Sequence, residues 1–163
     1  MRKTVYLETS IASYLAARPS RDVRAAAWQQ LTMQWWEQVR PSYELFVSEL
    51  VFVEASRGDA DTAARRLSFL AGIPVLRVDD EARALAERFI ADGAMPASAG
   101  PDALHVAIAV VHGVDYILTW NCRHIDNAAL RPQLRSSCTA AGYRCPEICT
   151  PLELLTEEDD DVS

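Results

Sequence analysis

Three acidic residues, far apart in the sequence, each stand at or just beyond the end of an apolar run, where a helix begins or is under way. They are Glu8, Glu54 and Asp102, and a fourth position of the same kind holds Asn121. Carboxylates that are brought together repel one another unless a cation lies between them, and hard oxygen ligands favour Mg²⁺ or Mn²⁺. These residue types predict a metal-dependent phosphodiesterase.

Each acid also has an ordinary structural explanation. Glu8 follows three apolar residues, and a glutamate at a strand end is common on protein surfaces. Glu54 has mostly apolar neighbours, so its buried carboxylate needs a partner, which is an ion pair, a hydrogen-bond donor or a metal. Asp102 lies in the first turn of a helix, where the macrodipole stabilises negative charge by about 0.3–1 kcal/mol. The prediction therefore depends on the three acids meeting.

His105 lies one helical turn after Asp102 and shares a helix face with it and with His112. An Asp-x-x-His pair could be half of a di-metal carboxylate motif, but the chain has no second copy. Packing or surface roles are the favoured interpretation of these histidines.

The elements that must position the acids alternate between strand-like and helix-like stretches. Strands are expected at 4–7, 44–47, 75–78, 116–119 and 147–149. Helices are expected at 11–17, 22–39, 49–56, 61–71, from Asp79 or Asp80 to Gly93, 102–112, 128–134 and 137–141. This alternation predicts an α/β fold, a three-layer α/β/α arrangement with a short, mostly parallel sheet of four or five strands. The carboxyl ends of parallel strands share one edge, where distant acids can gather.

The chain has 163 residues, of which 50% are hydrophobic, and this predicts a single domain over residues 1–155. Five of the negative charges that make up the formal −7 lie consecutively at 157–161, which leaves −2 on the rest. Residues 156–163 are expected to form an acidic, disordered tail. Basic residues cluster locally and could guide a nucleic acid or line ordinary helix faces; they are Arg18, Arg21, Arg24, Arg65, Arg66, Arg123, Arg131 and Arg135.

No apolar stretch is long enough for a membrane span, and residues 1–3 lead directly into the first expected strand, so a cytoplasmic protein is expected. The four cysteines are Cys122, Cys138, Cys145 and Cys149. They are too few and too unevenly spaced for a secreted disulfide framework, and the Cys145–Cys149 spacing is looser than that of usual zinc pairs. Reduced, buried thiols are expected.

Four segments together resemble the PIN-domain nucleases, especially the VapC-type ribonuclease toxins of bacterial toxin–antitoxin pairs. They are VYLETS (5–10), VSELVFVE (47–54), DALHVAIA (102–109) and YILTWN (116–121). No single motif is very specific, but their order and spacing are, and the resemblance extends over residues 4–155.

The resemblance implies that Glu8, Glu54 and Asp102 bind one or two Mg²⁺ or Mn²⁺ ions, with Asn121 at the fourth catalytic position. Ser10 would support the first acid through a hydrogen bond, and Thr119 would belong to the same supporting set. The site would hydrolyse RNA phosphodiesters. Beyond the fourth strand, Arg123 and His124 could contact the phosphate. A cognate antitoxin and a second copy of the chain would be its protein partners.

Two departures from the family pattern bear on activity. The family usually has an aspartate where this chain has the longer Glu8, and often an aspartate where it has the neutral Asn121. Asp126 could replace the missing charge, although capping a helix before Ala128 is the favoured role. Fewer anionic ligands weaken metal binding. The alternative function is therefore a PIN-fold module that binds RNA or protein without cleaving. A phosphotransfer receiver or an aspartate-nucleophile phosphatase does not fit, because Glu8-Thr9-Ser10 offers no nucleophilic aspartate.

Trp28, Leu31 and Trp35 recur at helical spacing, and Trp36 lies beside them. Such a stripe is most often part of the core. The other interpretation is a surface that pairs with an antitoxin or a second copy.

Overall fold

The computed structural model of the protein describes residues 1–155, and the expected acidic tail, 156–163, lies outside the described residues. The strands are β1 (Thr4–Leu7), β2 (Glu44–Ser48), β3 (Val75–Leu76), β4 (Tyr116–Leu118) and β5 (Glu147–Cys149). The α-helices are α1 (Thr9–Ala16), α2 (Val23–Gln34), α3 (Glu49–Ala55), α4 (Ala60–Leu70), α5 (Asp80–Ala91), α6 (Gly100–Val111) and α7 (Arg131–Ala140). A π-helical turn, Trp35–Val39, continues α2.

The five strands form one sheet in the order β3-β2-β1-β4-β5, and every neighbouring pair is parallel. The predicted α/β class is confirmed, and the sheet expected to be mostly parallel is wholly parallel in residues 1–155. The chain leaves the central β1 for β2 and β3 on one side, and then crosses to β4 and β5 on the other. Ligand sites of open α/β sheets form where the strand order reverses in this way, which here is the carboxyl end of β1 and β4.

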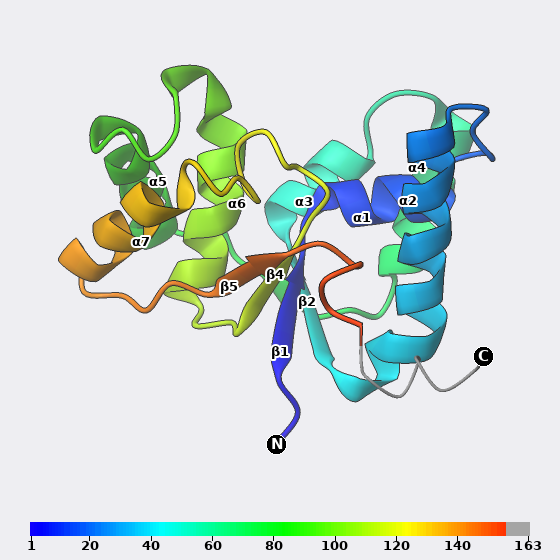
Figure 1. The fold of residues 1–163 in the computed structure, drawn as a ribbon, viewed down its shortest axis with the longest axis horizontal. Coiled ribbons are helices and arrows are strands. Elements are labelled where there is room, and N and C mark those ends of the chain that lie inside the picture. The colour runs from blue at the N-terminus through cyan, green and yellow to red at the C-terminus, as the bar shows by residue number, and fades with distance from the viewer. Residues whose placement is uncertain (156–163) are drawn as a thin grey trace.

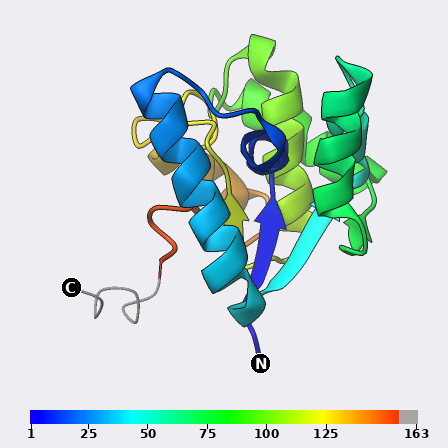
Figure 2. The same cartoon turned by 90° about the vertical axis from the view of Figure 1, so that its right-hand side faces the viewer.

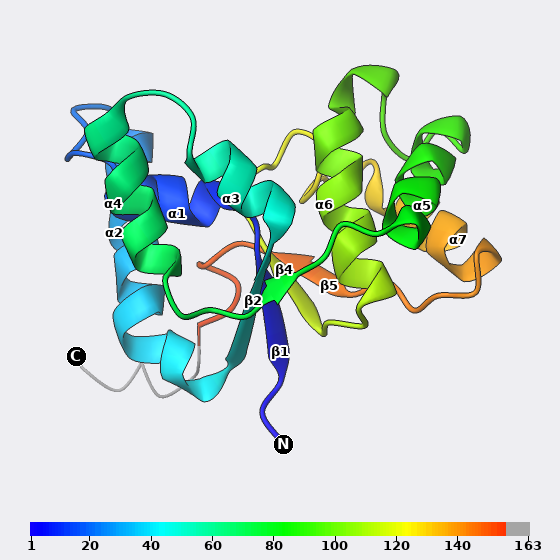
Figure 3. The same ribbon diagram turned by 180° about the vertical axis from the view of Figure 1, so that it is seen from behind.

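Helices cover both faces of the sheet, which confirms the three-layer arrangement. Helices α1, α2 and α4 lie on one side and α5, α6 and α7 on the other (Figure 1). The start of α1, seen end-on in Figure 2, stands directly above the tip of β1. From behind, α3 starts at the end of β2 and runs away from α6, toward α4 (Figure 3). Because β1 is covered on both faces, Val5, Tyr6 and Leu7 are all buried.

The expected pair of helices at 128–134 and 137–141 is wrong. The structure has a single helix there, α7, which begins at Arg131 with Pro132 in its first turn. Residues 128–130 form a turn, and Asp126 forms an ion pair with Arg131 instead of capping a helix. Burial and the nearby Glu153 raise the pKa of Asp126 to about 6, although Arg131 acts against this.

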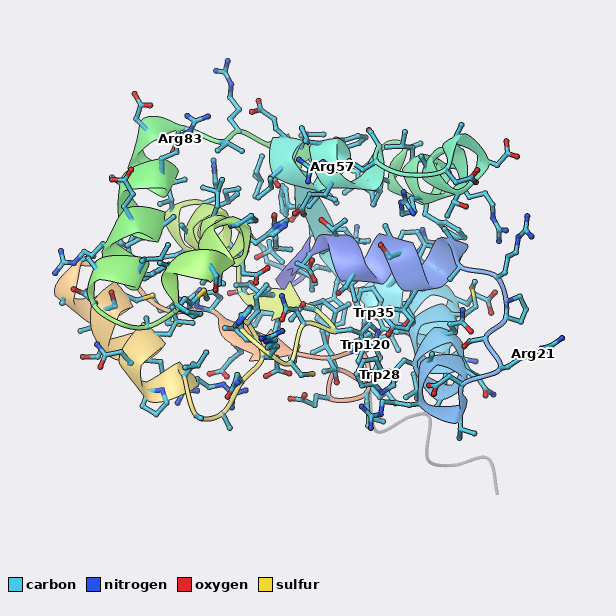
Figure 4. All side chains as sticks on the ribbon, turned by 90° about the horizontal axis from the view of Figure 1, so that it is seen from above. Arg21, Trp28, Trp35, Arg57, Arg83 and Trp120 are labelled. Carbon is cyan, nitrogen blue, oxygen red and sulfur yellow. The ribbon has the colours of Figure 1, made fainter. Side chains whose placement is uncertain are left out.

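The aromatic stripe of α2 belongs mainly to the core, as predicted. Trp35 and Trp36 are buried. Trp28 is half-buried and stacks on Trp120, with 4.6 Å between ring centroids (Figure 4). The loop after β4, which carries Trp120, is therefore packed against α2.

All four cysteines are free thiols. Cys138 and Cys149 are buried and Cys145 is half-buried, but Cys122 is exposed, so the expectation of buried thiols holds fully only for Cys138 and Cys149. Across residues 1–155, no helix combines the length and apolar character needed to cross a membrane.

Candidate metal site at the carboxyl edge of the sheet

Glu8 is the residue at which β1 ends and α1 begins. Its backbone N–H still donates to Leu118 of β4 at 3.1 Å, and its side chain caps α1. Glu8 Oε1 accepts from Ser10 Oγ at 2.5 Å and from Thr119 Oγ1 at 2.6 Å, while Oε2 accepts from the Ser10 N–H at 3.1 Å. Only 7% of the residue is exposed, and donors from α1 and from the loop after β4 hold its carboxylate in place.

Glu54 lies in the last turn of α3 and turns toward Glu8. Its Oε1 accepts from Thr9 Oγ1 at 2.6 Å and from His105 Nε2 at 2.5 Å. Burial acts to raise the pKa of Glu54, but the hydrogen bond and charge of His105, the Thr9 hydroxyl and Arg57 outweigh it, so the pKa lies below its ordinary value. The ionised form, and the stability that its contacts contribute, persist until the pH falls through that lowered pKa.

His105 is buried inside this cluster. One ligand atom from each of Glu8, Glu54 and His105 lies within 4.8 Å of the others. The sequence favoured a packed or surface histidine. His105 is packed, but its position beside Glu8 and Glu54 was not predicted. The available signal was its spacing: one turn after Asp102, in a helix of apolar residues that would bury it.

Asp102 lies in the first turn of α6, apart from Glu8 and Glu54. Its Oδ2 accepts from His124 Nδ1 at 2.8 Å, and its side chain is 23% exposed. Asp102 is not among the atoms that meet within 4.8 Å. The structure therefore brings Glu8 and Glu54 together and holds Asp102 separately, through an imidazole.

Asn121 uses its amide oxygen to shape the loop after β4. Oδ1 accepts from the His124 N–H at 3.1 Å, and the Asn121 N–H donates to Thr119 Oγ1 at 2.9 Å. Thr119 in turn donates to Glu8, so this loop and the first acid are linked. Arg123 is exposed beside them.

An open groove of about 660 Å³ begins at this loop. It is lined mainly by apolar residues, together with Arg123 and His124; among the apolar residues are Ile90, Met95, Pro96 and Leu130. His124 lines the groove and contacts Asp102, so the groove adjoins Asp102.

The donor set fits a hard divalent cation. Both hydrogen bonds recorded for the Glu54 carboxylate within residues 1–155 fall on Oε1, which leaves Oε2 for a cation. Glu8 keeps acceptor capacity on Oε2, which receives one donor. Single-oxygen carboxylate ligands with room for water suit Mg²⁺ and Mn²⁺. His105 Nε2 is already occupied by Glu54.

Comparisons with known proteins identify the fold. The PIN domain family model matches residues 5–129. Mycobacterium tuberculosis VapC20, described as a Sarcin-Ricin loop cleaving toxin, aligns with a TM-score of 0.55 and 15% identity over 85% of this chain and 95% of its own. Rickettsia felis VapBC2, solved bound to a DNA fragment from its promoter, aligns with a TM-score of 0.56 and 10% identity over 90% of this chain and 98% of its own. At these identities the likeness shows a shared fold. No curated protein matches the sequence.

Proposed function

Since the chain belongs to the PIN-domain family, we propose that it is a metal-dependent endoribonuclease, the toxin of a toxin–antitoxin pair. The observation that carries this proposal is the meeting of Glu8 and Glu54. Their carboxylates come from separate elements, 46 residues apart in the sequence, and lie, with His105, within 4.8 Å at the reversal point of the sheet. Two carboxylates this close, in a largely buried site, are stabilised by a cation.

Glu8 and Glu54 would hold Mg²⁺ or Mn²⁺, and Asp102 would complete the site from the start of α6. Bound there, the cation would activate water and neutralise charge on the scissile phosphate. The chain's own contribution is position: Ser10 and Thr119 fix Glu8, and His124 fixes Asp102.

The substrate would approach along the loop after β4. Arg123 is exposed and positively charged, and it lines the apolar groove together with His124. A backbone phosphate at Arg123 and a base against the apolar lining would match this arrangement, because single-stranded RNA offers charge and flat apolar faces together.

The protein partners proposed from the family are an antitoxin and a second copy of the chain. Val23, at the start of α2, is a large apolar residue that is 85% exposed. A shallow groove of about 300 Å³ lies between α1 and α2, lined by residues that include Tyr14, Leu15 and Met33. An apolar helix of a partner would cover such a surface.

A second function, a PIN-fold module that binds RNA or protein without cleaving, is favoured by Asn121 and Asp102. The amide of Asn121 is used within its own loop, and Asp102 is held apart by His124. Fewer charged ligands weaken metal binding.

The proposed activity is tested on single-stranded RNA with and without Mn²⁺. We expect endonucleolytic cleavage that requires Mn²⁺ or Mg²⁺, stops when a chelator is added and returns when the metal is restored. RNA binding without cleavage at any Mn²⁺ concentration would favour the non-cleaving module. Cleavage that survives chelation would contradict the proposed site.

Replacing the neutral residue after β4 tests the effect of the missing charge. Asn121→Asp keeps an oxygen that can accept from the His124 N–H and adds a negative charge. Because affinity rises with the charge of the ligand set, Mn²⁺ should bind on the order of tenfold more tightly, as measured by titration calorimetry. Asn127→Asp, which adds the same charge farther along the loop, is the control. Equal effects of the two substitutions would show that only net charge matters.

A further inference from the structure

A chain of hydrogen-bonding side chains runs behind Glu54. Ser48 Oγ lies 2.8 Å from Tyr6 Oη, Tyr6 Oη lies 2.7 Å from His105 Nδ1, and His105 Nε2 lies 2.5 Å from Glu54 Oε1. Ser48, Tyr6 and His105 are each at most 1% exposed. Carboxylates can bind a cation without these three side chains, so cation binding alone does not explain why they are buried together. Buried polar groups are retained only when their hydrogen bonds are satisfied.

The donors in this chain have one consistent direction. An ionised carboxylate only accepts, so His105 Nε2 carries the proton that faces Glu54. When the ring is uncharged, Nδ1 is then an acceptor, and the Tyr6 hydroxyl donates to it. Burial raises the pKa of Tyr6 far above its ordinary value, so the phenol keeps its proton. The Ser48 hydroxyl donates to Tyr6 and accepts from the Val51 N–H at 3.3 Å.

The same chain of contacts encloses α3, the helix that carries Glu54. Ser48 caps the start of α3 and Glu54 lies in its last turn, while Tyr6 comes from β1 and His105 from α6. A helix of seven residues has little stability of its own. Its direction, and therefore the direction of Glu54, must be set by contacts with β1 and α6.

We propose that Tyr6 and His105 are positioning residues, which turn Glu54 Oε1 back into the protein and present Oε2 as a single-oxygen metal ligand. This inference rests on the proposed metal site and adds to it that His105 is not itself a ligand, because its Nε2–H is committed to Glu54. Groups that orient metal ligands in this way affect affinity without touching the metal.

Mn²⁺ titrations of the full chain test the inference with three substitutions. His105→Leu removes the N–H and should lower Mn²⁺ affinity by about 10- to 100-fold. His105→Gln can place an amide N–H near the position of Nε2 and should stay within about threefold of the unsubstituted protein. Tyr6→Phe keeps the ring, leaves Nδ1 without its donor and should lower affinity by about tenfold. His112→Gln, an exposed histidine bonded to the Arg77 carbonyl, is the control.

One further readout and the pattern of the titrations separate failure of the positioning role from failure of the proposed metal site. ¹⁵N–¹H correlation spectra of the metal-free protein should show the His105 proton on Nε2, and a proton on Nδ1 alone would overturn the inference whatever the metal does. If His105→Leu and Tyr6→Phe both fold and bind Mn²⁺ as tightly as the unsubstituted protein, the positioning role is wrong. If His105→Gln binds as weakly as His105→Leu, the claim that His105 is not a ligand is overturned. No Mn²⁺ binding by the unsubstituted protein would overturn the proposed function, and the role of His105 with it.

Discussion

Glu54→Gln is expected to lower both Mn²⁺ affinity and RNA cleavage by at least about 100-fold, because changes to groups that merely support ligands already cost 10- to 100-fold. The amide can still accept from Thr9 and His105, so the fold should be kept. The change removes a negative charge that the lowered pKa of Glu54 holds in place. Calorimetry with Mn²⁺ and single-turnover cleavage measure the two losses.

Asp102→Asn provides the comparison that defines the site. A loss of cleavage similar to that of Glu54→Gln would place Asp102 in the working site, and a loss of less than about tenfold would confine the site to Glu8 and Glu54. Glu147→Gln, at the exposed amino end of β5, is the matched control and should change neither quantity. Full activity in both Glu54→Gln and Asp102→Asn would refute the proposed metal site.

Trp35→Ala should destabilise the protein by about 3–5 kcal/mol, the usual cost of removing a buried tryptophan. Trp35 has no exposed surface and lies at the start of the π-helical turn, against Tyr43, with 6.2 Å between ring centroids. For a domain of this size the loss corresponds to about 6–20 °C in Tm. Urea unfolding followed by circular dichroism measures it.

Trp28→Ala separates core packing from a surface role for the aromatic stripe. Trp28 is half-buried and stacks on Trp120, so its removal should cost about 1–2 kcal/mol. A Trp35→Ala protein that keeps its stability but no longer binds a partner would mean that this residue belongs to an interface instead of the core.

The sequence predicted the sheet well because each strand is a short apolar run bounded by polar or turn-forming residues. The expected strand 4–7 is observed unchanged, and 75–78 is shortened to Val75–Leu76. Helix boundaries were less accurate where capping differed from expectation. Around α7, the pairing of Asp126 with Arg131 replaced the predicted cap, a contact that depends on the tertiary fold.

The sequence predicted that three acids would meet, and the structure brings two of them together, but their partners could not be predicted. Glu8 and Glu54 meet as the spacing of strand ends suggested. The pairing of Asp102 with His124, and the position of His105 behind Glu54, depend on how α3, α6 and the loop after β4 pack together. A single helix face gives the direction of a side chain but not what stands opposite it.

The sheet order also has a consequence for how the protein is made. Glu8 gains its hydrogen bond from Thr119 only when that residue, from beyond β4, has reached β1, and Glu54 gains its hydrogen bond from His105 only when α6 stands beside it. Parallel crossovers of this kind close late, because distant segments must meet before any contact forms. A chain that leaves the ribosome unfinished carries both glutamates without these partners, so the proposed ribonuclease activity would arise only in the completed molecule.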